Sequence, residues 1–158
     1  MDLDDPSNPN FPNDQVNNGP EIADNVITVG ALESNYGSEM IAPYSNYGAI
    51  NVDVFAPGSD IYSTNPGNKY EFSNGTSFAA PGVAGIAALI RSQYPKLTAP
   101  EVKKIIMVSG LKVKTSVILS GDPAKGSTLE KASKSGKIAN AYNALLLADK
   151  VSKGKIKV

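Results

Sequence analysis

The sequence predicts an α/β fold, because short runs typical of strands are combined with longer runs typical of helices. A β-branched run over Val26–Ala31 indicates a buried strand, and Val52–Phe55 indicates a second short strand. The stretch from Ser77 to Ile90 carries no charge and indicates a helix. An amphipathic helix is predicted after Thr98.

Composition and charge exclude several classes of function. The 158 residues allow one domain with a hydrophobic core, and 41% hydrophobic against 19% charged residues is an ordinary globular composition. Because 15 Lys and Arg balance 15 Asp and Glu, nothing points to a nucleic-acid partner. The absence of cysteine excludes disulfides, a thiol nucleophile and thiolate metal sites. The absence of histidine excludes an imidazole base and every metal site that contains histidine.

Residues 1–20 are polar and rich in proline, which predicts an irregular surface segment. No signal peptide is visible, because the residues after Met1 are acidic and lack an apolar run. The favoured interpretation is a solvated, frayed terminus. The alternative is a calcium site, since several side chains here carry oxygen: Asp2, Asp4, Asp5, Asn8 and Asn10.

The region between the first strand and the central helix reads as loops and short strands. Residues 33–49 form a predicted loop, whose tyrosines are expected to pack on the loop with their hydroxyls in water rather than stack on a ligand: Tyr36, Tyr44 and Tyr47. Ile61–Thr64 is a predicted third strand, and Tyr70–Phe72 is predicted to be one arm of a hairpin.

The central helix is unusual because it is apolar all round and built mostly from alanine and glycine. A helix of this kind is expected to be buried on all sides, with its axis close to neighbouring strands. Its apolar part is shorter than the ~20 residues that span a bilayer, so a transmembrane segment is not predicted. Pro81 fits because it lies in the first turn, where its missing N–H has no helical partner.

The loop before this helix offers a candidate for chemistry. Gly75 permits a tight turn, and Thr76 and Ser77 then stand at the helix N-terminus, where free N–H groups favour negative charge. A serine placed there can be a nucleophile whose own N–H helps to hold an oxyanion. The spacing alone favours a simpler interpretation, in which the hydroxyls cap a buried helix.

The last third of the chain is predicted from its caps. Thr98 and Glu101 form a capping box, and Gly110 is a natural residue to end that helix. Residues 111–119 alternate as a half-exposed strand, and 120–137 have the composition of a loop or long turn. Asn140 caps a final helix to about Val151, and the basic residues 152–158 are expected to be a solvated tail. No internal repeat is found.

Three stretches resemble the subtilisin-like serine proteases, or subtilases, in the order that the family has them. They are Val26–Ala31, then Tyr44–Gly48 running on to Val54–Gly58, and finally Asn74–Pro81 continued by Val83–Gly85. The third resembles the family's active-serine signature. The similarity covers about Ile22 to Val108 and, more weakly, Gly136 to Ala148. Gly82 stands where most of the family has a histidine, which is understood as a packing residue rather than a catalytic one.

The resemblance implies a three-layer fold with a mainly parallel sheet flanked by helices, incomplete in this chain. It implies that residues 1–158 are the C-terminal portion of one subtilase catalytic domain. It also makes Ser77 the nucleophile and an oxyanion donor, Thr76 a support for the oxyanion hole, and Asn74 a substrate contact. Phe11-Pro12 is similar to an aromatic–proline pair near the family's S1 pocket, although an ordinary turn explains it equally well.

The resemblance also defines what this sequence lacks. The family supplies Asp, His and an oxyanion Asn before the serine, and we expect them outside this sequence. The parent is expected to be a secreted or cell-surface endopeptidase of polypeptides that requires no cofactor, although calcium is common in the family. The chain alone is expected to be inactive, to need the N-terminal part of its own domain, and to self-associate without it. The alternative is a non-catalytic subtilase-like module for binding or structure.

Overall fold

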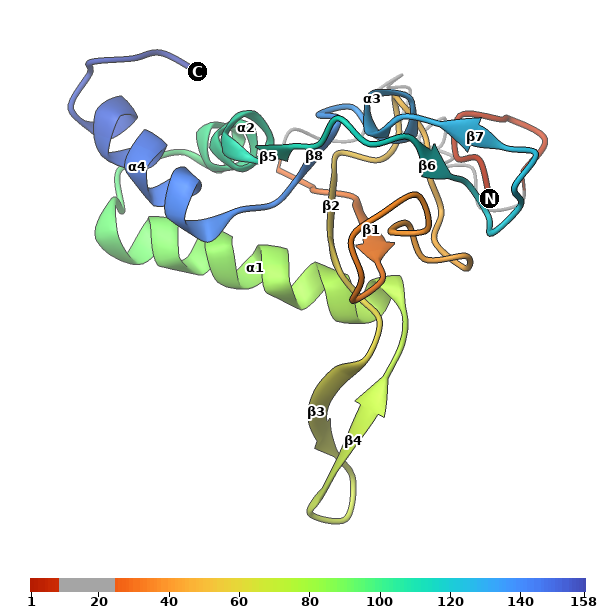
Figure 1. The fold of residues 1–158 in the computed structure, drawn as a ribbon. Helices are drawn as coiled ribbons and strands as arrows, with labels where there is room; N and C mark the ends of the chain where they lie inside the picture. Colours follow the sequence, from red (N-terminus) through yellow and green to blue (C-terminus); the bar gives the residue numbers. More distant parts are fainter. Residues whose placement is uncertain (9–24) are drawn as a thin grey trace.

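The protein has an α/β fold, which the computed structural model describes for residues 1–8 and 25–158 (Figure 1). Its main sheet has four strands in the order β1-β2-β8-β5. The first three are parallel and β5 is antiparallel to β8, so the predicted mainly parallel sheet is confirmed. The bounds of these strands are β1 (Val29–Leu32), β2 (Val54–Pro57), β8 (Lys137–Ile138) and β5 (Leu111–Lys112).

Helices and two small hairpins complete the part of the fold that the structure describes (Figure 1). The helices are α1 (Thr76–Gln93), α2 (Ala99–Ser109), α3 (Leu129–Ala132) and α4 (Ala141–Ser152). The hairpin formed by β3 (Ile61–Asn65) and β4 (Lys69–Ser73) projects away from the body of the molecule and leads into α1 (Figure 1). The second hairpin pairs β6 (Val117–Ile118) with β7 (Gly126–Ser127).

Alternation along β1 and β2 divides the core into two apolar clusters, one on each face of the sheet. Ala31 and Val54 point to the face that α1, α2 and α4 cover, where they join Val83, Ile105 and Ala144. The opposite face is covered by loops, β6 and α3, with these residues at its centre: Leu32, Phe55, Ile41, Val117 and Leu129. Phe55 lies directly over Gly30, where an added Cβ would collide with its ring.

The helix caps that the sequence predicts are present. The Thr98 hydroxyl accepts from the Glu101 N–H at 3.4 Å, and the Glu101 carboxylate accepts from the Thr98 N–H at 2.7 Å. The Asn140 side chain accepts from the Asn143 N–H at 2.9 Å and begins α4. Both helices therefore start where local chemistry alone places them.

Several predicted boundaries are wrong, for physical reasons. The first strand begins at Val29 and Val26 is exposed, because Lys103 and Asp53 side chains bond the backbone before it. Residues 111–119 are divided between β5 and β6, which lie in different sheets, and residues 120–137 contain β7 and α3. Gly110 is not left-handed; a side chain there would meet the Ile138 carbonyl oxygen at 2.7 Å.

The ends of the chain also depart from the prediction. Leu3 is buried, and its N–H donates to the Tyr47 carbonyl at 2.7 Å, so residues 1–8 are docked rather than frayed. The Asp4 carboxylate holds this segment by accepting from the N–H groups of Ile50 and Asn51. At the other end the basic tail is exposed as predicted, except that Val158 packs against the apolar cluster of α1, α2 and α4.

Candidate active site

Ser77 is exposed and lies in the first turn of α1, one residue after the helix begins. The N-cap is Gly75, at φ 154° and ψ 155°, a conformation that only glycine adopts without strain. No side chain caps the helix. The interpretation of Thr76 and Ser77 as ordinary capping hydroxyls is therefore wrong.

The loop before Ser77 is fixed by the turn that follows β2. The Gly75 N–H donates to the Gly58 carbonyl at 2.8 Å, and the Tyr44 hydroxyl donates to the same oxygen at 2.9 Å. The Asn74 side-chain oxygen accepts from the Asp60 N–H at 2.6 Å. Because both turns are bonded to each other, the position of the Ser77 loop is set by the end of a sheet strand.

Gly58 is the point of closest approach in this arrangement. A Cβ there would lie 2.7 Å from the Ala31 Cβ, 2.9 Å from the Gly75 carbonyl oxygen and 3.2 Å from the Ala79 Cβ. These three atoms belong to β1, the serine loop and α1. A residue without a side chain thus lets sheet, loop and helix meet at one place.

The electrostatics at this end of α1 favour an anion. The first turn contains no acidic residue, and the backbone N–H groups of a first turn have no helical acceptor. Within residues 1–8 and 25–158 the Ser77 hydroxyl has no hydrogen-bond partner. The chain contains no histidine, so its own side chains offer no imidazole to remove the hydroxyl proton. The site therefore combines an exposed serine hydroxyl with a helix end that favours an anion, and the chain supplies no imidazole.

The other predicted site residues lie close by. Thr76 is half-buried at the start of α1, and Asn74 is exposed, with its oxygen used by Asp60. Sequence reasoning included Tyr44 and Gly58 in the stretches that resemble the family, but it did not infer that they hold the serine loop. Tyr36 and Tyr44 are exposed, and each hydroxyl has a protein partner: that of Tyr44 donates to the Gly58 carbonyl, and that of Tyr36 lies 3.0 Å from the Thr115 hydroxyl.

The N-terminal carboxylates are engaged in local hydrogen bonds. Asp2 accepts from the Asp4 N–H at 3.0 Å, and Asp5 accepts from the backbone and hydroxyl of Ser7, bonds that lower the pKa of Asp5. In the described part of the chain no three acidic side chains gather as a metal site would require. Calcium binding stays a prediction, and three residues of interest lie outside the described residues: Asn10, Phe11 and Pro12.

The central helix differs from its prediction in one respect. Ala79, Val83 and Ile90 are buried against the sheet and the neighbouring helices, but the opposite face of α1 is exposed. A helix this apolar was expected to be buried on all sides. Among the described residues, none of the helices combines the length and apolar character needed to cross a membrane.

Comparison with known proteins identifies the family. The model of the subtilase family matches residues 5–141. Subtilisin DY of Bacillus licheniformis is 50% identical over 84 residues, which are 53% of this chain and 29% of that protein. A thermophilic serine proteinase of Bacillus sp. (strain AK1) is 51% identical over 74 residues, 47% of this chain and 18% of that protein. The chain therefore spans less than a third of the length of these relatives.

Solved structures agree with the sequence relatives. The A-subunit of the AB5 toxin from E. coli superposes with a TM-score of 0.61 at 29% identity, covering 78% of this chain and 38% of that one. The patellamide maturation protease PatA gives a TM-score of 0.57 at 28% identity, covering 79% and 43%. The family model covers most of the chain and the fold agrees with it, so this chain belongs to the subtilase family.

Proposed function

We propose that the complete protein is a subtilisin-like serine endopeptidase and that Ser77 is its nucleophile. One observation carries the proposal: the Ser77 hydroxyl is exposed in the first turn of α1, after a glycine in a conformation that other residues rarely adopt, and that turn contains no acidic residue. A capping serine would bond the helix backbone instead. The matched relatives named as subtilisins and serine proteinases support the same role.

In this proposal Ser77 attacks the carbonyl carbon of a peptide bond while its hydroxyl proton passes to an imidazole. The Ser77 N–H, free of a helical acceptor, donates to the developing oxyanion. Thr76 supports the oxyanion hole without contacting the oxyanion itself. The Asn74 side chain contacts the leaving-group side of the substrate. The acyl-enzyme formed when the C–N bond breaks is then hydrolysed by water.

The base must come from polypeptide outside this sequence, because the chain has no histidine. A serine hydroxyl without a base and an orienting carboxylate is a poor nucleophile. We therefore expect the 158-residue chain to be inert toward peptides. By family likeness, its parent is expected to act outside the cell or at the cell surface.

The test joins this chain to the part of subtilisin DY that precedes the matched stretch, a protein called the fusion below. A fluorophosphonate probe should label Ser77 in the fusion and leave the 158-residue chain unlabelled. Ser77→Ala should remove peptidase activity of the fusion; in subtilisin itself, a relative of this chain, losing the nucleophile lowers kcat by about 10⁶. The fold should persist, since removing one exposed oxygen leaves no cavity.

The matched control is Ser92→Ala, an exposed serine at the other end of α1, which should leave labelling and activity unchanged. Stoichiometric labelling of the chain alone at a protease-like rate would show that another base activates Ser77. A cooperatively folded fusion that remains unlabelled would instead favour the non-catalytic module.

A further inference from the structure

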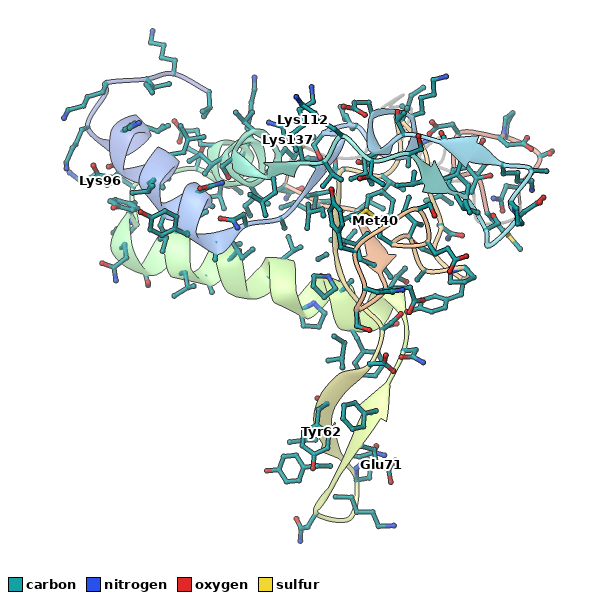
Figure 2. All side chains as sticks on the ribbon, in the orientation of Figure 1. Met40, Tyr62, Glu71, Lys96, Lys112 and Lys137 are labelled. Carbon is teal, nitrogen blue, oxygen red and sulfur yellow. The ribbon has the colours of Figure 1, made fainter. Side chains whose placement is uncertain are left out.

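The serine loop leads from the β3–β4 hairpin into α1 (Figure 2). One backbone oxygen, the carbonyl of Gly58, connects this loop with the end of β2. It accepts from the Gly75 N–H at 2.8 Å and from the Tyr44 hydroxyl at 2.9 Å, and these two donors use both of its lone pairs. The Gly75 carbonyl accepts from the Phe78 N–H at 3.0 Å, and Ser77 lies inside this turn. The place of Ser77 therefore follows that of Gly75 and of the oxygen that holds it.

The Tyr44 hydroxyl belongs to a chain of hydrogen bonds that runs in one direction. A tyrosine has a single O–H, and here it is donated to the Gly58 carbonyl. The Ser59 hydroxyl lies 2.6 Å from the tyrosine oxygen, so Ser59 is the donor in that pair. Ser59 is buried, and within the described part of the chain its hydroxyl has no other partner. Each donation polarises the next group, which strengthens the bonds of such a chain.

Both sides of this chain of hydrogen bonds are supported by β1. On one side, the fully buried Ser45 hydroxyl accepts from the Ala31 N–H at 2.9 Å and so fixes the residue next to Tyr44. On the other side, the Gly58 N–H donates to the Leu32 carbonyl at 3.0 Å. The tyrosine hydroxyl and the carbonyl that it bonds are therefore both held by the same strand of the sheet.

The hydroxyl is the part of Tyr44 that the structure uses. The side chain is partly exposed and belongs to neither of the two apolar clusters, so the ring adds little to the core. Phenylalanine at this position would keep the contacts of the ring, and it would lose the bonds to both Gly58 and Ser59.

We infer that Tyr44 is a positioning residue for the reaction of Ser77. Its hydroxyl orders the Gly58 carbonyl, and this carbonyl holds the Gly75 N–H and with it the direction from which Ser77 attacks. This inference rests on the proposed function. A reacting group that is displaced slows the chemical step, whereas substrate binding depends on the remaining contacts.

Tyr44→Phe in the fusion tests this role. The variant should lower kcat for a peptide substrate about three- to tenfold, the factor that corresponds to one net hydrogen bond. KM should change by less than about twofold, because the interaction acts on the chemical step. Tyr36→Phe is the matched control, since its hydroxyl bonds Thr115 rather than a residue of the serine loop. This control should leave both constants unchanged.

A double variant separates positioning from stability. Tyr44→Phe leaves the buried Ser59 hydroxyl without its partner, so Tm should fall as well. Adding Ser59→Ala removes that hydroxyl and should restore most of the lost Tm. It should not restore kcat, because the Gly58 carbonyl still lacks its donor. Recovery of kcat together with Tm would show that Tyr44 acts through stability alone, which overturns the inference.

Hydrogen exchange at the Gly75 amide reports on the loop without any need for activity. In the 158-residue chain, Tyr44→Phe should speed this exchange about three- to tenfold. The rate is compared with that of the Val102 amide, which is bonded to the Thr98 carbonyl and records any loss of global stability. Tyr36→Phe should leave the ratio of the two rates unchanged.

The possible results separate the inference from the proposed function. An active fusion whose kcat is unchanged by Tyr44→Phe overturns the inference and leaves the proposed function standing. A raised KM with unchanged kcat assigns Tyr44 to substrate binding and also overturns it. A fusion that a fluorophosphonate does not label refutes the proposed function, and exchange at Gly75 then decides the rest. Faster exchange keeps Tyr44 as the residue that orders the serine loop, and unchanged exchange overturns the inference.

Discussion

Gly58→Ala tests whether one close contact holds the serine loop in place. The new Cβ would lie 2.7 Å from the Ala31 Cβ, 2.9 Å from the Gly75 carbonyl oxygen and 3.2 Å from the Ala79 Cβ. None of these atoms is the end of a flexible side chain, so β1, the serine loop or α1 must shift. The φ angle of Gly58 is not positive, so the effect is one of space rather than of backbone strain. Overpacking of this kind lowers the free energy of unfolding by about 1–3 kcal/mol.

The assay is urea and thermal unfolding of the 158-residue chain, followed by circular dichroism. With a slope of about 2–4 °C per kcal/mol for a chain of this size, Tm should fall by roughly 2–12 °C. Gly82→Ala is the matched control, because a Cβ at this exposed helical position meets nothing within 4 Å. It should raise the free energy of unfolding by about 0.5–1 kcal/mol. A Gly58→Ala chain as stable as wild type, or a destabilised Gly82→Ala chain, would refute the reasoning.

Further predictions concern stability and association. Lys103→Met should lower the free energy of unfolding by about 3–5 kcal/mol in urea, because it removes the ammonium that lies 3.1 Å from the buried Asp53 carboxylate and leaves that charge with only the Thr28 N–H. Lys104→Met should change it by less than about 0.5 kcal/mol. Hydrogen bonds from the Thr98 N–H and hydroxyl lower the pKa of Glu101 in the folded protein below its ordinary value of 4.5. The stability that the capping box adds is therefore fully present above pH 4.5, and it is lost as the pH falls through the lowered pKa. Wild type should therefore lose more stability than Glu101→Gln between about pH 6 and pH 3, and equal losses would contradict this. Light scattering across a dilution series should show self-association of the chain, whereas a monomer at every concentration would show that the exposed apolar surface is too small to drive it.

Local chemistry explains which parts of the fold were predictable. Thr98 and Glu101 carry their cap within four residues, and Asn140 needs only the N–H three residues on, so α2 and α4 begin where predicted. The strand boundaries depended on distant residues. Val26 leaves the ladder because the Lys103 side chain, 77 residues away, bonds its carbonyl. No local pattern carries that information.

For the candidate site too, the local features were predictable from the sequence and the contacts with distant residues were not. Gly75 and Ser77 predict a turn and a helix start without help from distant residues, and the structure has Gly75 as the N-cap and Ser77 in the first turn of α1. The support of that turn was not predictable from spacing, because it comes from Gly58 and Tyr44, which approach through the sheet. The burial of α1 was overestimated for another reason. An apolar composition predicts burial on all sides, but within this chain only the face of α1 with Ala79, Val83 and Ile90 is buried.

Positioning and activation of the serine are separable in this chain. The hydrogen bonds that hold the serine loop are all made by residues of this chain. The Gly75 N–H and the Tyr44 hydroxyl both donate to the Gly58 carbonyl, and the Asp60 N–H donates to the Asn74 side chain. Activation requires a base, and no histidine is present to provide one. A preformed serine loop without a base is expected to be unreactive, since an unactivated serine hydroxyl attacks peptides slowly. Under the proposed function, catalysis therefore depends on the supply of a base to Ser77 rather than on building the loop itself.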